Sequence, residues 1–214
     1  MNSASDVVAI SPTFDLGSGD TTLYAATTRG LYRWDGGTAG WTLCFNAPVY
    51  AVGLPPTYSR TGPSGFPRHT VFVSTDDGAD NEVWFSNTDG DIGGWTETGY
   101  AGTSWGRVTD FAFPYNFGLT GYSREVFLAA ATLPPQPVGG AGGVYAGLHP
   151  YTSGTDWSNA GSGLNSGASV WGIAAEPRLF TPATNQEMVC ATDAGVFKTT
   201  NAGATPPTGV NWNR

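Results

Sequence analysis

Two aspartates are the residues of this sequence best suited to acid–base chemistry. Asp110 lies in the apolar run RVTDFAFP, and Asp6 directly precedes the apolar run VVAI. Glycoside hydrolysis needs two carboxyl groups about 5–9 Å apart, one of them with a raised pKa. A carboxylate in an apolar strand must be solvated or paired, because an unpaired buried charge is costly. Asp6 and Asp110 are therefore candidate catalytic residues, and a solvated Asp110 without a catalytic role is the simpler alternative.

Aromatic and basic side chains supply candidate ligand contacts. Flat rings in or beside loops offer stacking surfaces for a ligand. The candidate ligand-binding residues are Trp105, Arg107, Tyr115 and Trp171. We expect Tyr100 and Tyr151 to be exposed loop aromatics as well. The arginines are scattered along the chain, without the clustered set of three that a sialidase would need for its substrate carboxylate.

No pattern of residues indicates a metal ion or a cofactor. The run DDGAD at 76–80 resembles a cation-binding loop but lacks the longer ligand pattern that ends in Glu. His69 and His149 have no clustered partners of the kind a zinc site needs. No phosphate loop or nucleotide fingerprint is present. We therefore predict no metal and no cofactor, and we expect Cys44 and Cys190 to be buried free thiols.

The composition is typical of an all-β protein outside the cytosol. Among 214 residues there are 31 Gly and 15 Pro, and only 12% are charged, where about 25% is usual. We expect an extracellular or cell-surface location, although MNSASDVV is not a signal peptide. The net charge of −8 argues against a nucleic-acid partner. No apolar run approaches the roughly 18 residues of a membrane helix, so we expect no membrane insertion.

One pattern recurs four times along the chain. Each round contains an apolar stretch ending at a proline, a run rich in β-branched or aromatic residues, a short third run and a closing tryptophan. The closing residues are Trp41, Trp95, Trp157 and Trp212, separated by 54, 62 and 55 residues. A sustained period of this size indicates a repeat architecture.

Each round predicts four short strands and no helix. The runs in round one, for example, are VVAI, TLYAAT, GLYRW and WTLCF, fenced by Gly, Pro, Asp or Thr. Tight linkers between the second and third runs predict antiparallel hairpins. We predict an all-β β-propeller with four four-stranded antiparallel blades, alone or as part of a larger ring. The expected blades span about 6–46, 48–100, 106–161 and 168–214, and the fourfold recurrence disfavours a sandwich.

Round four carries a family resemblance. The run GVFKTTNAGAT, followed after an insert by Trp212, resembles the Asp-box of the bacterial neuraminidase repeat. Thr199, Asn201, Gly203 and Thr205 occupy its first four fixed positions. The whole chain is similar in plan to sortilin-type, xyloglucanase-like and sialidase-like propellers. The resemblance implies structural roles for Asn201 and Gly203, whose turn would be closed by the Asn side chain, and for the four closing tryptophans, which would pack between neighbouring sheets.

Fold alone does not fix the function. The first hypothesis is a non-enzymatic binding module that recognises a glycan or a protein. The second is a glycoside hydrolase that uses Asp6 and Asp110. The third is a structural subunit, in which self-association or further propeller blades complete a ring.

Overall fold

We analysed a computed structural model of the chain. It describes residues 7–10, 20–61, 68–76, 81–100, 105–115, 117–118, 125–132, 142–149, 151, 153–165, 167–176, 187–202 and 210–214. The candidate residues Asp6 and Gly203, and positions 77–80 of the DDGAD run, lie outside these ranges.

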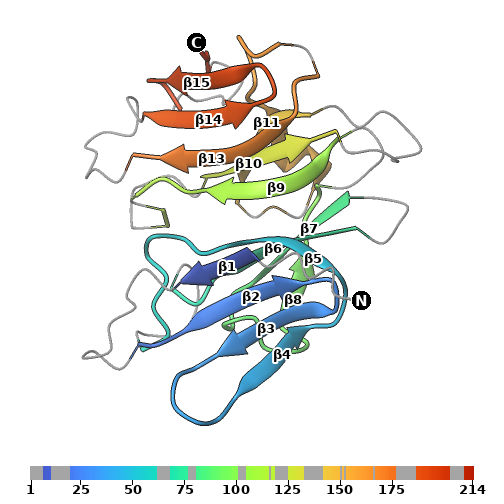
Figure 1. The fold of residues 1–214 in the computed structure, drawn as a ribbon, viewed down its shortest axis with the longest axis vertical. Helices are drawn as coiled ribbons and strands as arrows, with labels where there is room; N and C mark the ends of the chain where they lie inside the picture. Colours follow the sequence, from blue (N-terminus) through green and yellow to red (C-terminus); the bar gives the residue numbers. More distant parts are fainter. Residues whose placement is uncertain are drawn as a thin grey trace.

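The described residues form four antiparallel sheets, one for each round of the repeat, and we call them blades 1 to 4 (Figure 1). Blade 1 contains β1 (Val7–Ile10), β2 (Leu23–Thr27), β3 (Gly30–Trp34) and β4 (Trp41–Phe45). Blade 2 contains β5 (Val49–Gly53), β6 (Val71–Asp76), β7 (Asn81–Ser86) and β8 (Trp95–Glu97). Blade 3 contains β9 (Arg107–Ala112), β10 (Glu125–Ala131), β11 (Gly143–Leu148) and β12 (Trp157–Asn159). Blade 4 contains β13 (Val170–Ala175), β14 (Met188–Thr192) and β15 (Gly195–Thr199).

In every blade the strands follow the chain order and pair with their sequence neighbours. This meander confirms the predicted all-β fold of four antiparallel sheets. Blade 4 departs from the four-stranded expectation, because the place of its fourth strand is taken by an isolated antiparallel bridge between Asn213 and Lys198. The only helix among the described residues is the single 3-10 turn Gly154–Asp156, and none of their helices has the length and hydropathy to span a bilayer.

Tight turns make the hairpins within the blades. In blade 1, Thr27 pairs with Gly30 at the turn between β2 and β3. Gly30 has a φ of 141°, and a Cβ there would lie 2.2 Å from the carbonyl oxygen of Phe45. Only glycine fits this conformation and this close approach. Gly195 holds the same position in blade 4, with a φ of 124°.

The blades stand side by side in an open arc, with blade 1 and blade 4 at its opposite ends (Figure 1). Neighbouring blades meet mainly through their first two strands, since β9 packs against both β5 and β13, and β5 packs against β1 and β2. The first strand of each blade therefore lies innermost. Each strand alternates between the two faces of its sheet, which lets one blade pack against both of its neighbours.

The core consists of three apolar clusters, one for each junction between successive blades. Tyr24 and Ala26 of blade 1 face Val71 and Val73 of blade 2. The next residue along β6, Phe72, faces blade 3 instead. The third cluster joins blades 3 and 4, and both cysteines are buried free thiols within the clusters, as predicted.

Three of the four closing tryptophans lie between blades. Trp212 is 3% exposed, and its indole Nε1 donates to the carbonyl oxygen of Ala160 in blade 3 over 2.8 Å. Trp157 is 5% exposed and packs edge-on against Tyr100 of blade 2, with ring centroids 5.3 Å apart. The indole Nε1 of Trp95 donates to the carbonyl oxygen of Cys44 in blade 1 over 2.9 Å. Trp41 differs, because no blade of the same chain covers it: it is 50% exposed, and its side of blade 1 faces away from blade 2.

Candidate functional site

Each innermost strand of blades 2, 3 and 4 contains a β-bulge near its start. The pairing of β5 passes from Val49 directly to Ala51, and that of β13 passes from Val170 to Gly172. In β9 it passes from Val108 to Asp110. The skipped residues are Tyr50, Thr109 and Trp171, which we call the bulge row. Bulges redirect a side chain and are frequent beside active sites.

The bulge row lies along three adjacent strands. Since β9 packs against β5 on one side and β13 on the other, Thr109 belongs to the strand between those that carry Tyr50 and Trp171. Thr109 is half-buried, and its hydroxyl donates to the carbonyl oxygen of Val170 over 2.8 Å. Trp171 is 48% exposed and presents the most accessible ring of the row.

Arg107, at the start of β9, contacts Tyr50 of the bulge row. Its guanidinium carbon lies 4.2 Å from the ring centroid of Tyr50, in a cation–π contact. This places a positive charge and an aromatic ring together at the junction of blades 2 and 3. Of the four predicted ligand-binding residues, Arg107 and Trp171 therefore lie at the same end of neighbouring inner strands.

The other two predicted contacts lie elsewhere. Trp105 is half-buried, with its ring centroid 4.7 Å from that of Tyr100 and 5.0 Å from that of Tyr145, so it packs on the core between blades 2 and 3. Tyr115 is 38% exposed, but it follows the end of β9, at the opposite end of that strand from Arg107.

The expectation of exposed rings at Tyr100 and Tyr151 is wrong. Both side chains are fully buried. The Tyr100 hydroxyl donates to the carbonyl oxygen of Gly106 over 2.9 Å, which satisfies its polar atom inside the core. Tyr151 packs edge-on against Phe72 and Phe85 of blade 2. Both rings are thus part of the apolar cluster between blades 2 and 3.

Asp110 joins the inner strands of blades 3 and 4. Its Oδ1 accepts a hydrogen bond from the amide of Phe111 over 2.8 Å, and its Oδ2 accepts one from the amide of Ile173 over 3.0 Å. Burial raises the pKa of the Asp110 carboxyl above its ordinary value, and these two bonds oppose that shift. Asp110 directly follows the bulge residue Thr109. Its proposed partner Asp6 lies outside the described residues.

The turn in round four has a side-chain closure like the one that the Asp-box resemblance implies. The Oδ1 of Asn201 accepts hydrogen bonds from the hydroxyl of Thr199 over 2.7 Å and from the amide of Asn211 over 3.1 Å. Both partners belong to the segment that leads to Trp212. Asn201 therefore stabilises the end of blade 4 and lies away from the bulge row.

A buried polar network between blades 1 and 2 was missed by the sequence analysis. Asp89, with a φ of 57°, is its centre. Its carboxylate lies 2.7 Å from Nδ1 of His69 and accepts from the hydroxyl of Tyr58 over 3.0 Å. Its carbonyl oxygen accepts from the hydroxyl of Tyr24 over 2.8 Å and from Nη1 of Arg33 over 2.6 Å. Burial raises the pKa of both tyrosines.

The pairing of β6 with β7 in one hairpin is the feature from which this network could have been predicted. Val71 at the start of β6 pairs with Ser86 at the end of β7, so the residues just outside this pair are brought together. His69 and Asp89 are such residues, which is why His69 is not the isolated histidine that the sequence suggested. The network ties two blades together and lies apart from the bulge row.

Among the described residues, no group of three or more His, Cys, Asp or Glu side chains could hold a metal ion. The bulge row and its neighbours present an accessible indole, a tyrosine ring under a guanidinium, and a half-buried carboxyl group between two inner strands.

No protein-family model and no curated protein sequence matches the chain. Among solved structures, the chain is similar to an ancestral GH74 enzyme, with a TM-score of 0.51 and 13% sequence identity. The match covers 97% of this chain and 32% of that enzyme, so the chain spans about a third of its length. At this identity the likeness shows the fold alone, a β-propeller arrangement of blades.

Proposed function

We propose that the chain binds a glycan along the bulge row. The observation that carries this proposal is the half-exposed indole of Trp171, which lies at a β-bulge of its inner strand as Tyr50 does in blade 2. A pyranose ring has an apolar face of C–H groups that stacks on an aromatic ring, and its hydroxyls need hydrogen-bonding groups at the edges. Arg107 supplies such donors beside Tyr50.

The ligand best suited to this surface is a neutral oligosaccharide. The chain carries a net charge of −8, which disfavours a polyanionic glycan. The similar fold of a GH74 enzyme, a glycoside hydrolase, supports carbohydrate as the ligand class over protein. An extracellular or cell-surface location belongs to the same proposal, as the chain's low content of charged residues favours it.

Calorimetric titration with neutral oligosaccharides, chosen from a glycan array, tests this proposal. Trp171→Ala should weaken binding by about tenfold or more, because stacked aromatic anchors dominate binding energy. Ile92→Ala is the control, since Ile92 is 71% exposed but lies in the turn between β7 and β8, outside the bulge row. Equal affinities for the wild type and Trp171→Ala would contradict the proposal.

Hydrolysis of the bound glycan is a second candidate function. Asp110 favours it, because burial raises its pKa toward the range of a general acid and it lies beside the row. Asp110→Asn should then reduce the rate by about 10²–10⁴-fold without loss of glycan affinity. If the wild-type protein hydrolyses no glycan and Asp110→Asn binds glycan with unchanged affinity, binding alone is the function.

A further inference from the structure

Blade 4 has an apolar face that points away from the rest of the arc. Along β14, Met188 and Cys190 are buried against blade 3, whereas Val189, at 43%, and its neighbour Ala191 are exposed. Val196 on β15 is 65% exposed. We call this surface face 4, and its members are Ala174, Val189, Ala191, Val196 and Lys198.

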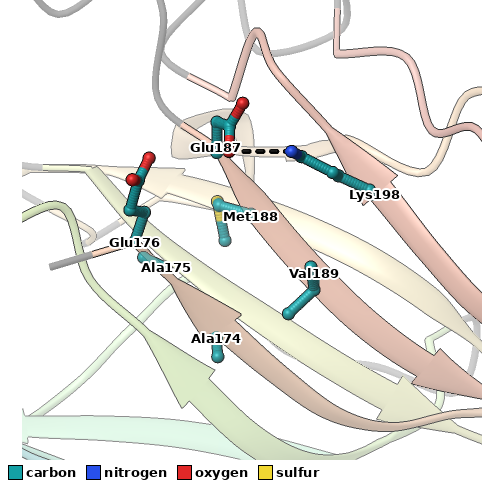
Figure 2. A pocket seen from close by; sticks show the side chains of 7 residues that line it. All are labelled: Ala174, Ala175, Glu176, Glu187, Met188, Val189 and Lys198. Atoms are coloured by element: carbon teal, nitrogen blue, oxygen red, sulfur yellow. Dashed lines mark ion pairs between the residues drawn. The ribbon is translucent and has the colours of Figure 1, made fainter.

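Face 4 is hollowed on the side where β13 ends and β14 begins. A cavity of about 200 Å³ is lined by Ala174 and Val189 and bordered by the ion pair between Glu187 and Lys198, whose charged atoms are 2.8 Å apart (Figure 2). Small side chains form the floor of the hollow, and charged ones form its rim. Such a surface suits insertion of an apolar side chain.

The counterparts of face 4 are covered at every internal junction. The second strands align on a threonine, at Thr27, Thr75, Thr132 and Thr192. The residue three positions before this threonine is Tyr24, Phe72 or Ala129 in blades 1 to 3, and each of these is fully buried by the following blade. In blade 4 the same position is held by Val189, which is exposed. Similarly, the counterparts of Val196 are Leu31 and Val83, which are fully buried.

At the other end of the arc, blade 1 presents the matching surface. Tyr24 and Ala26 face blade 2, so the alternate residues of β2 and their cross-strand partners face away. We call this surface face 1, and its members are Leu23, Ala25, Tyr32, Trp34, Trp41 and Leu43.

Face 1 carries the side chains that cover the preceding blade elsewhere in the molecule. Trp95 and Trp84 of blade 2 pack on Phe45 of blade 1, with ring centroids 5.1 and 5.7 Å away. In blade 1 the corresponding residues are Trp41 and Tyr32. Trp41 is half exposed, whereas Trp212, the closing tryptophan of blade 4, is buried against the blade before it.

We infer that face 4 of one copy of the chain binds face 1 of a second copy, in the geometry of the internal blade junctions. At the three internal junctions, the surface equivalent to face 4 is covered by residues of the following blade. Among the faces that the described residues present, only face 1 carries the counterparts of those covering residues. The contact is head-to-tail, so it closes into a ring or propagates as a filament. The described blades of two copies number eight, which lies within the usual range of closed propellers.

Light scattering of the full chain across a wide concentration range tests this contact. The wild type should form a dimer that dissociates on dilution. Val189→Glu places an unpaired charge in face 4 and should weaken the dimer about tenfold or more. Val196→Glu provides a second probe of the same face. Ile92→Glu is the matched control, because Ile92 is 71% exposed and lies in a turn of blade 2, outside both faces.

A mixing experiment distinguishes head-to-tail binding from pairing of like faces. Trp41→Ala damages only face 1 and should also weaken the dimer. Each variant alone then lacks a working junction, but a mixture of Val189→Glu with Trp41→Ala keeps one intact junction and should form a mixed dimer. A wild type that stays monomeric at every concentration, or a Trp41→Ala variant that dimerises normally by itself, would overturn the inference. Circular dichroism melts establish that each variant is folded.

Discussion

The indole Nε1 of Trp95 donates to the carbonyl oxygen of Cys44 over 2.9 Å, and this bond ties the end of blade 2 to the outer strand of blade 1. Trp212 makes the equivalent bond to Ala160. In both junctions the acceptor lies three residues after the closing tryptophan of the preceding blade. At two of the three internal junctions, a donor and an acceptor at fixed positions of the repeat thus join successive blades.

This relationship predicts a graded effect of replacing the closing tryptophans by phenylalanine. Trp95→Phe and Trp212→Phe each remove the donor and should lower the free energy of unfolding by about 0.5–1.5 kcal/mol beyond the effect of the lost ring volume. Trp157→Phe is the internal control, because its Nε1 is buried without a hydrogen-bond partner among the described residues. Denaturant titrations that rank Trp157→Phe as the most costly of the three would contradict this role.

The network around Asp89 predicts that the stability of the junction between blades 1 and 2 depends on the hydroxyl group of Tyr58. Tyr58→Phe removes the donor to the Asp89 carboxylate and the contact to the Tyr24 hydroxyl, 2.9 Å away. The loss leaves a buried acceptor less well satisfied, so unfolding should become about 1–3 kcal/mol easier. Tyr115→Phe, at an exposed ring, should change stability by less than about 0.5 kcal/mol. Indistinguishable urea midpoints for the two variants would argue against the network.

Asp110 predicts a specific dependence of stability on pH. Burial raises its pKa above the ordinary 3.8, so the folded state binds this proton more tightly than the unfolded chain. Its contribution to stability is full below pH 3.8 and is lost as the pH rises through the raised value. Asn does not titrate, and the other carboxyl groups are common to both proteins. The stability advantage of the wild type over Asp110→Asn should therefore shrink as the pH rises across this window. A constant or growing difference in chemical denaturation would be inconsistent with a raised pKa.

The strands of this fold could be predicted from the sequence because their signals are local. The run GVFKT at 195–199 matches β15, and TLYAAT at 22–27 contains β2. The repeat of four rounds then led to four sheets. The weak point was round four, where a bridge at Asn213 replaces a full last strand. Strand pairing at the end of a sheet depends on the geometry of the neighbouring segments more than on the type of residue.

The candidate site was only partly predictable, because it depends on pairing between strands. Arg107 and Trp171 were expected at a ligand surface, and they do lie at the same end of adjacent inner strands. The bulges at Tyr50 and Trp171 have no signature in a single strand, since a bulge is defined by the pairing with the neighbouring strand. Tyr100 and Tyr151 looked like loop aromatics, but a neighbouring blade covers them. Trp41 shares its sequence pattern with Trp212, and only its place in the arc leaves it exposed.

The most direct test of the glycan-binding surface is ¹⁹F NMR of the protein labelled with 5-fluorotryptophan, titrated with a neutral oligosaccharide that binds in calorimetry. The Trp171→Phe variant assigns the resonance of Trp171, and Trp41→Phe assigns that of Trp41. We predict that the Trp171 resonance shifts on saturation with the oligosaccharide while the Trp41 resonance stays in place. A Trp171 resonance that does not move when the oligosaccharide is bound would contradict the proposed site.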